Sequence, residues 1–156
     1  MRATVEVIVG CLWLGAAIFF STAVAQAAFS VLPSRTLAGA LVGRTLPVVF
    51  YAGIVAGCIV IAVELAGGSA TRSAWRITGA AVVATLCAVA QFGIGSRIER
   101  VRASIPGAIE DLPASDARRI AFGQLHGVSV GLLGVAILAA VLVVVLAART
   151  ISPRVP

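Results

Sequence analysis

The chain has 156 residues, of which 60% are hydrophobic and 12% are charged, and its mean hydropathy is +1.10. A soluble domain carries about 25% charged residues, so this composition excludes an ordinary soluble fold and predicts an integral membrane protein. The net charge is +6, and every basic residue is an arginine that lies beside or between the apolar runs. That placement suits anionic lipid headgroups and does not indicate a nucleic acid partner.

The first apolar run covers residues 5–31. It follows Arg2, and its small residues at 23–27 offer sites at which a signal peptidase could cleave. However, the run is longer than the ~7–15 apolar residues of a signal peptide. We therefore expect it to be an uncleaved first transmembrane helix.

The second run begins after a break at Pro33, where Ser34 is suited to cap the next helix. Residues 36–66 read as a long helical segment that is interrupted at Pro47, because proline removes a backbone hydrogen bond and kinks a helix. The part that crosses the membrane is predicted at residues 46–65. Residues 36–45 are either an extension of it or a short interfacial helix.

The third span is predicted at residues 75–95, beginning at Trp75 between Arg72 and Arg76, a pattern typical of a membrane interface. A polar loop at residues 96–115 follows, and its first part, to residue 104, can continue the third helix into water. Ser115 or Asp116 can cap a fourth helix that crosses the membrane at residues 120–146. The whole chain, residues 1–156, is thus predicted to be one all-α domain, a four-helix transmembrane bundle.

Four spans place both termini on one side of the membrane. Five arginines are predicted on that side: Arg2, Arg72, Arg76, Arg149 and Arg154. Seven are predicted on the other side: Arg35, Arg44, Arg97, Arg100, Arg102, Arg118 and Arg119. The positive-inside rule therefore places the arginine-rich loops in the cytoplasm and the termini outside. We expect a multi-pass protein of a bacterial inner membrane, since arginine without lysine also fits a bacterium with a GC-rich genome.

Small residues recur four apart on several helix faces. Gly123, Gly127 and Gly131 share one face of the fourth helix, and Gly53 and Gly57 share one face of the second. Such spacing lets transmembrane backbones approach closely, and three glycines in a helix are otherwise costly. We predict that both faces are helix-packing sites, either within the chain or between copies in a homo-oligomer.

Catalytic and metal-binding patterns are not convincing. Residues 127–131 match G-x-S-x-G around Ser129, but that motif requires a strand, a sharp turn and later acid and histidine partners, which an apolar helix does not supply. The chain has one histidine, one methionine and three cysteines without a C-x-x-C pair. These counts argue against haem, thioether copper and zinc sites. We therefore predict no enzyme activity, no metal and no cofactor.

Four polar side chains are predicted near one membrane face, because consecutive helices run in opposite directions: Gln26, Arg44, Gln91 and His126. At ~1.5 Å per residue, the glutamines and His126 lie ~6–9 Å inside the boundary. They can form one polar cluster, in which His126 hydrogen bonds to a neighbour and switches charge near neutral pH. The alternative is that each reaches headgroups or satisfies a neighbouring backbone. Two acidic residues are expected near the opposite face with an arginine partner: Glu6 and Glu64, with Arg72 or Arg149.

Short motifs extend over most of the chain: Trp13-Leu14-Gly15, Phe19-Phe20, Ala38-Gly39, Val42-Gly43-Arg44, Phe122, Leu125-His126-Gly127 and Ser129. This set resembles the transmembrane protein 205-like family, four-helix membrane proteins known in bacteria as a domain of unknown function. The resemblance implies a four-helix bundle. Because eukaryotic members are associated with platinum-drug resistance, it also implies transport or trafficking.

From the sequence, we predict a non-catalytic membrane protein that acts as an accessory subunit or a self-associating bundle. Its expected partners are membrane lipid and either a second copy or another membrane protein. The alternative is a small transporter or an export factor that uses the face holding Gln26, Gln91 and His126.

Overall fold

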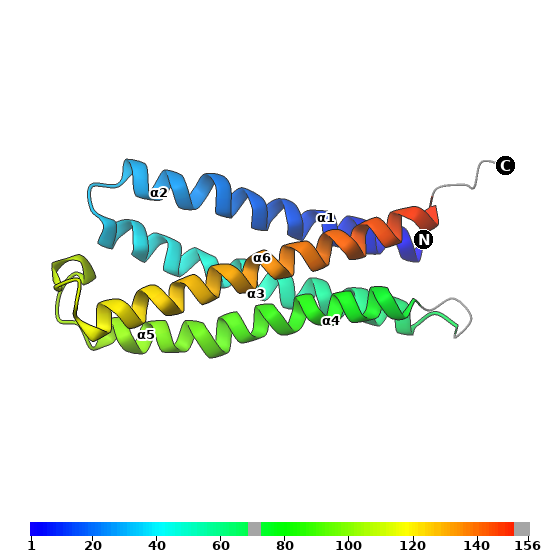
Figure 1. Cartoon of the computed structure of the whole chain (residues 1–156). Coiled ribbons are helices and arrows are strands. Elements are labelled where there is room, and N and C mark those ends of the chain that lie inside the picture. Colours follow the sequence, from blue (N-terminus) through cyan, green and yellow to red (C-terminus); the bar gives the residue numbers. More distant parts are fainter. Residues whose placement is uncertain (69–72, 152–156) are drawn as a thin grey trace.

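A computed structural model describes residues 1–68 and 73–151, and within these residues it contains helices and no strand. Four long helices run side by side along the molecule (Figure 1). Each of the four is long and apolar enough to cross a membrane, with mean hydropathy of 1.9 to 3.1 in its apolar stretch. The predicted all-α four-helix membrane bundle is confirmed.

Each helix extends beyond the segment predicted to cross the membrane. The elements of the first two helices are α1 (Arg2–Phe19), η1 (Phe20–Val24) and α2 (Ala25–Val31), then α3 (Arg35–Leu65). The third helix consists of α4 (Ala74–Ala88), η3 (Val89–Gly95) and α5 (Ser96–Ala103), and after the short turn η4 (Ile109–Asp111) the fourth is α6 (Ala117–Ile151). α5 confirms that the third helix continues to about residue 104.

The predicted capping residues occupy the starts of α3 and α6. The Ser34 hydroxyl accepts a hydrogen bond from the Leu37 amide at 3.2 Å, and Asp116 accepts one from the Arg118 amide at 2.8 Å. These bonds satisfy amides that have no partner inside a helix. By contrast, α3 runs without a break through Pro47, so the expected interruption is wrong and residues 36–45 extend the second helix. Proline removes only one hydrogen bond, and the turns on either side keep theirs.

The first and third helices each contain a wider π turn, η1 and η3, that the sequence pattern did not predict. Hydroxyl groups satisfy carbonyls there: Ser21 and Thr22 donate to the carbonyls four residues earlier, each at 2.8 Å. Ser96 donates to the Phe92 carbonyl at 2.7 Å in the same way. A π turn changes the direction and rotation of the helix that follows, so α2 and α5 do not simply continue the packing of α1 and α4.

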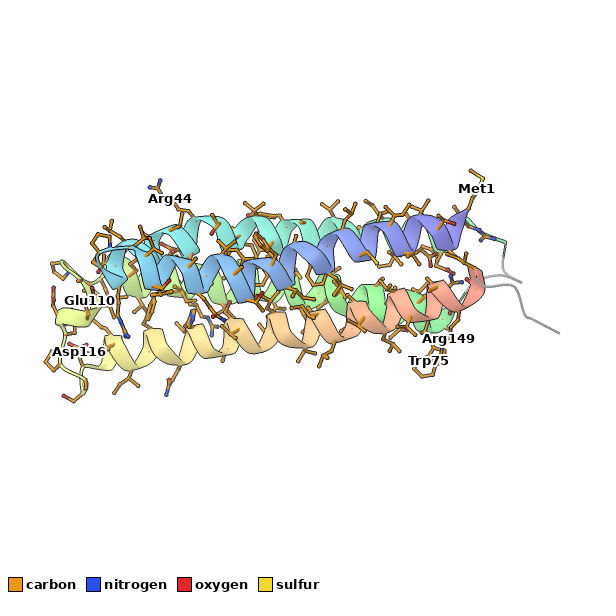
Figure 2. The ribbon with its side chains drawn as sticks, turned by 90° about the horizontal axis from the view of Figure 1, so that it is seen from above. Met1, Arg44, Trp75, Glu110, Asp116 and Arg149 are labelled. Atoms are coloured by element: carbon orange, nitrogen blue, oxygen red, sulfur yellow. The ribbon has the colours of Figure 1, made fainter. Side chains whose placement is uncertain are left out.

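The bundle is closed at one end and open at the other. In cross-section α1 lies between α3 and α6, and α4 also lies between α3 and α6. Past the π turns, α2 packs against α3 and α5 packs against α6. Both views show α2 and α6 moving apart toward the end that holds the α5–α6 connection (Figures 1 and 2). The opposite end holds the start of α1 and the end of α6 (Figure 1).

The two glycine faces have different surroundings. A Cβ on Gly57 would lie 2.7 Å from the Ala80 carbonyl oxygen, and one on Gly53 would lie 2.6 Å from the Cys87 sulfur, so α3 and α4 are in close contact there. Around Gly123, Gly127 and Gly131 nothing lies within 4 Å of such a Cβ, and the face is exposed. α6 packs instead through a different stripe: Ser129, Leu133, Ala136, Ala140, Val143 and Ala147. The expected packing at the three glycines is therefore not made within the described chain, and contact between chains stays a prediction.

Candidate functional site

A cleft of about 390 Å³ lies at the open end of the bundle. Its walls come from α2, α3, α5, the α5–α6 connection and α6. Its polar lining residues are Arg35, Thr36, Glu99, Arg102, Glu110, Arg119, His126 and Ser129. Sites for small ligands usually occupy about 300–1,000 Å³ and combine apolar walls with a few polar groups, so this cleft has the size and lining of a ligand site.

Arg102 is the central charged residue of the cleft. α5 brings its guanidinium against α3, where Nη1 lies 3.1 Å and Nη2 3.5 Å from the positions that a Cβ would take on Gly43 and Gly39. The Arg102 guanidinium also lies over the Phe122 ring of α6, 5.6 Å from its centroid, in a cation–π contact. Its ion pair with Glu99 is long, at 3.6 Å, and its side chain is 33% exposed. The two glycines therefore make room for an arginine and not for another helix.

His126 continues the same wall of the cleft. Its ring is parallel to that of Phe122, with an interplanar angle of 2° and ring centroids 6.3 Å apart. The side chain is exposed, and it makes no hydrogen bond within the part of the chain that the structure describes. Arg102, Phe122 and His126 thus give the cleft a cationic group beside two flat rings.

The α5–α6 connection is held over the cleft by hydrogen bonds. Thr36 donates to the Glu110 carboxylate at 3.0 Å, which joins the connection to α3. Arg119 donates to the Leu112 carbonyl at 2.6 Å, and Arg118 donates to the Ser104 carbonyl at 3.4 Å. Arg118 also binds Asp116, and these hydrogen bonds lower the pKa of the Asp116 carboxyl to about 2. The roof of the cleft therefore has a defined shape.

The charges in the cleft favour an anionic group. Three arginines face two glutamates, and one of those glutamates, Glu110, is already bound by Thr36. Arg35 is exposed and has no hydrogen-bond partner among residues 1–68 and 73–151. The remaining walls are largely apolar and include Phe29, Leu46, Ile98 and Ile109. Guanidinium groups beside apolar walls can bind the charged head of an amphiphile and part of its hydrocarbon.

The predicted polar cluster is not brought together. Of its four residues, His126 lines the cleft, whereas Gln26, Arg44 and Gln91 do not. No hydrogen bond joins His126 to any of the other three in the described residues. Gln26 and Arg44 are exposed, and Figure 2 shows Arg44 pointing away from the bundle. The prediction used depth along each helix, but rotation about the helix axis decides which side chains meet.

Arg102 is the functional candidate that the sequence reasoning missed, because its polar segment was assigned to water. The sequence did contain a signal. Arg102 and Glu99 are spaced three residues apart, as an ion pair on a helix requires, and their segment directly follows the apolar third span. The residues that carry the family resemblance point to the same place. Six of them line the cleft: Gly39, Val42, Gly43, Phe122, His126 and Ser129.

A second polar group lies at the closed end, inside the bundle. Arg76 of α4 donates to Glu6 of α1 at 2.9 Å and to Glu64 of α3 at 2.8 Å. The second oxygen of Glu64 accepts from the Ser73 amide at 2.9 Å. The expected pairing of these glutamates with Arg149 is wrong, because Arg76 points inward from α4 while Arg149 is exposed. The other expected partner, Arg72, lies outside the described residues.

No set of three histidine, cysteine, aspartate or glutamate side chains is placed to hold a metal ion within the described ranges. The three cysteines are free: Cys11 and Cys58 are exposed, and Cys87 is buried. The polar groups that can bind a ligand are therefore the arginines of the cleft and the buried group at the closed end.

A family model described as "Domain of unknown function (DUF4149)" matches residues 9–106, which is more than half of the chain. The matched segment includes Gly39, Gly43 and Arg102 of the cleft and ends before α6. No curated protein and no solved structure matches. The predicted resemblance to a membrane domain of unknown function is confirmed, and the narrower transmembrane protein 205-like label stays a prediction.

Proposed function

Because this chain belongs to the DUF4149 family, whose function is unknown, we propose its function from the geometry of the cleft: it is a non-catalytic membrane protein that binds the headgroup of an anionic phospholipid. The observation that carries the proposal is the position of Arg102. Its guanidinium lies between Gly39 and Gly43 of α3 and the Phe122 ring of α6, inside a cleft with apolar walls. Arg35 and Arg119 add two further cationic groups.

The chemistry of these groups suits a phosphate diester. Arginine presents several N–H donors in a planar fork that matches phosphate oxygens, and it keeps its charge at any physiological pH. The stacking of Arg102 on Phe122 limits the conformations of its side chain, so less conformational entropy is lost when a phosphate binds.

The shape of the cleft suits a headgroup and not a whole lipid. Its volume of about 390 Å³ is that of a site for one small ligand. α2 and α6 diverge at this end (Figure 1), and both contribute lining residues, Phe29 from α2 and His126 from α6. We propose that the acyl chains leave between these two helices and enter the surrounding bilayer.

The arginine-rich end also suits the leaflet in which anionic lipids are concentrated. We propose that the membrane is a bacterial inner membrane and that the cleft faces the cytoplasm, as the positive-inside rule predicts. Anionic lipids give the cytoplasmic leaflet a negative surface potential, which attracts arginines near it. The role of accessory subunit or self-associating bundle stays a prediction beside this proposal.

The test uses the full chain purified in a mild detergent and studied by native mass spectrometry with added lipids. We expect phosphatidylglycerol to bind more tightly than phosphatidylcholine. Arg102→Gln should weaken phosphatidylglycerol binding about 10–100-fold, since a hydrogen bond to a charged group contributes about 1.5–3 kcal/mol.

Arg44→Gln is the matched control, because it removes the same charge at the same end from a side chain that points away from the bundle (Figure 2). Equal loss in the two variants would show that only surface charge attracts the lipid, and it would contradict the proposal. Inorganic phosphate supplies a further arm. If phosphate alone binds as tightly as the lipid, the cleft is a site for a soluble anion and the lipid proposal is wrong.

A further inference from the structure

The buried polar group at the closed end contains a feature that the proposed function does not use. Glu6 is fully buried, Glu64 is 2% exposed and Arg76 is 8% exposed, and they come from three different helices. Three of the four carboxylate oxygens accept a hydrogen bond, two from Arg76 and one from the Ser73 amide. The fourth, Oε1 of Glu6, is buried and has no hydrogen-bond partner among the described residues.

An orphaned carboxylate oxygen in an apolar interior is costly, because it has lost water and gained no donor. A proton on that oxygen removes the charge and turns the acceptor into a donor. Both carboxylates face the same Arg76 guanidinium, at 2.9 Å for Glu6 and 2.8 Å for Glu64, and each Glu64 oxygen keeps a second lone pair. We propose that Glu6 and Glu64 form a proton-binding site, in which one proton is held between two carboxyl groups that face the same Arg76 guanidinium.

The step is a simple protonation. A hydronium ion from the solvent gives up one proton: its O–H bond breaks, an O–H bond forms on Oε1 of Glu6, and a water molecule is left behind. Groups from α1 and α6 lie at the same end of the bundle (Figure 1). Arg2 of α1 lies against Gly67 at this end, Val143 and Ala147 of α6 are apolar and buried, and Arg149 is exposed. With Arg2 at this end, the net charge does not by itself favour a bound proton, whereas the missing hydrogen-bond donor at Oε1 of Glu6 does.

The surroundings indicate binding and not conduction. One helical turn deeper than Glu6, Glu64 and Arg76 lies a cavity of about 20 Å³, lined among others by Gly10, Val60 and Ala80. A buried water needs two to four polar partners, and this cavity has apolar walls. It therefore offers no route for a proton deeper into the bundle. The proton enters and leaves at the end of the bundle where α1 begins.

The experiment is infrared difference spectroscopy on the full chain in lipid bilayers, titrated over pH. We expect wild type to show the absorption of a protonated carboxyl group at neutral pH. This absorption should be lost in Glu6→Gln and kept in the control Glu99→Gln, which changes an exposed glutamate at the other end of the bundle. Absence of the absorption in wild type, or its persistence in Glu6→Gln, would contradict the proposal.

A second measurement addresses folding. Glutamine has the shape and neutrality of protonated glutamate, so Glu6→Gln should fold. Its melting temperature should not change over the pH range in which wild type loses this proton. The melting temperature of wild type should fall as pH rises through the range in which its carboxyl absorption is lost. Failure of Glu6→Gln to fold would show that the site requires a carboxylate, and the proposal would then be wrong.

Discussion

Gly57→Ala tests whether α3 and α4 are held together by close backbone approach. The added methyl group would lie 2.7 Å from the Ala80 carbonyl oxygen, 2.9 Å from the Ala84 Cβ and 3.2 Å from the Ala84 amide nitrogen. Ordinary contacts of a Cβ begin at 3.4 Å. Two of the three atoms belong to the backbone of α4, so no side chain can rotate away and the helices must move apart.

The expected cost follows from two opposing effects. Forcing an extra methyl group into a packed core costs about 1–3 kcal/mol, and a rigid backbone neighbour places this site at the upper end. Alanine in place of glycine favours the helix by about 1 kcal/mol. The net expectation is that Gly57→Ala lowers the free energy of unfolding by about 2 kcal/mol.

Equilibrium unfolding in mixed micelles measures this change through tryptophan fluorescence. Trp13 is a suitable reporter, since it is buried beside Gly53 and its indole donates to the Val49 carbonyl at 3.0 Å. Gly127→Ala is the matched control, because nothing lies within 4 Å of its added methyl group. The control should unfold like wild type or be more stable by up to about 1 kcal/mol.

Two results would refute the reasoning. If Gly57→Ala were as stable as wild type, α3 and α4 would not be as close as described. If Gly127→Ala were the less stable variant, the exposed glycine face of α6 would be buried against another chain, as the predicted contact between copies in a homo-oligomer requires.

Two further predictions concern the open end of the bundle. Gly43→Ala should weaken phosphatidylglycerol binding several-fold in native mass spectrometry and leave the fold intact, because its methyl group would lie 3.1 Å from Nη1 of Arg102 and displace a side chain that can move; unchanged binding would show that the position of Arg102 is not important. For Asp116, whose pKa is lowered from 3.8 to about 2 by hydrogen bonds from Arg118, the stabilisation is present above pH 3.8 and is lost as pH falls through about 2. Asp116→Asn should therefore flatten the acid limb of a thermal unfolding profile in that window, and an unaltered limb would contradict the assignment.

Composition and local signals were sufficient for the architecture. Four apolar runs longer than ~20 residues must be helical in a bilayer, because only helices satisfy every backbone group inside one segment. Ser34 and Asp116 mark helix starts through hydrogen bonds that form within three residues. These features depend on the chain near each residue, so they could be predicted without knowing how the helices pack.

The pairing of residues across helices was decided by the tertiary structure alone. Gly57 and Gly127 have the same kind of neighbours in sequence, yet only Gly57 lies against another helix. Glu6 and Glu64 meet Arg76, and Arg102 lies against Gly43, although no local pattern selects these partners. A soluble helix reveals its inner face by the period of its apolar residues, but a membrane helix is apolar on all sides and carries little such signal. Its rotation is therefore set by close packing with its neighbours, which becomes visible only when all four helices are in place.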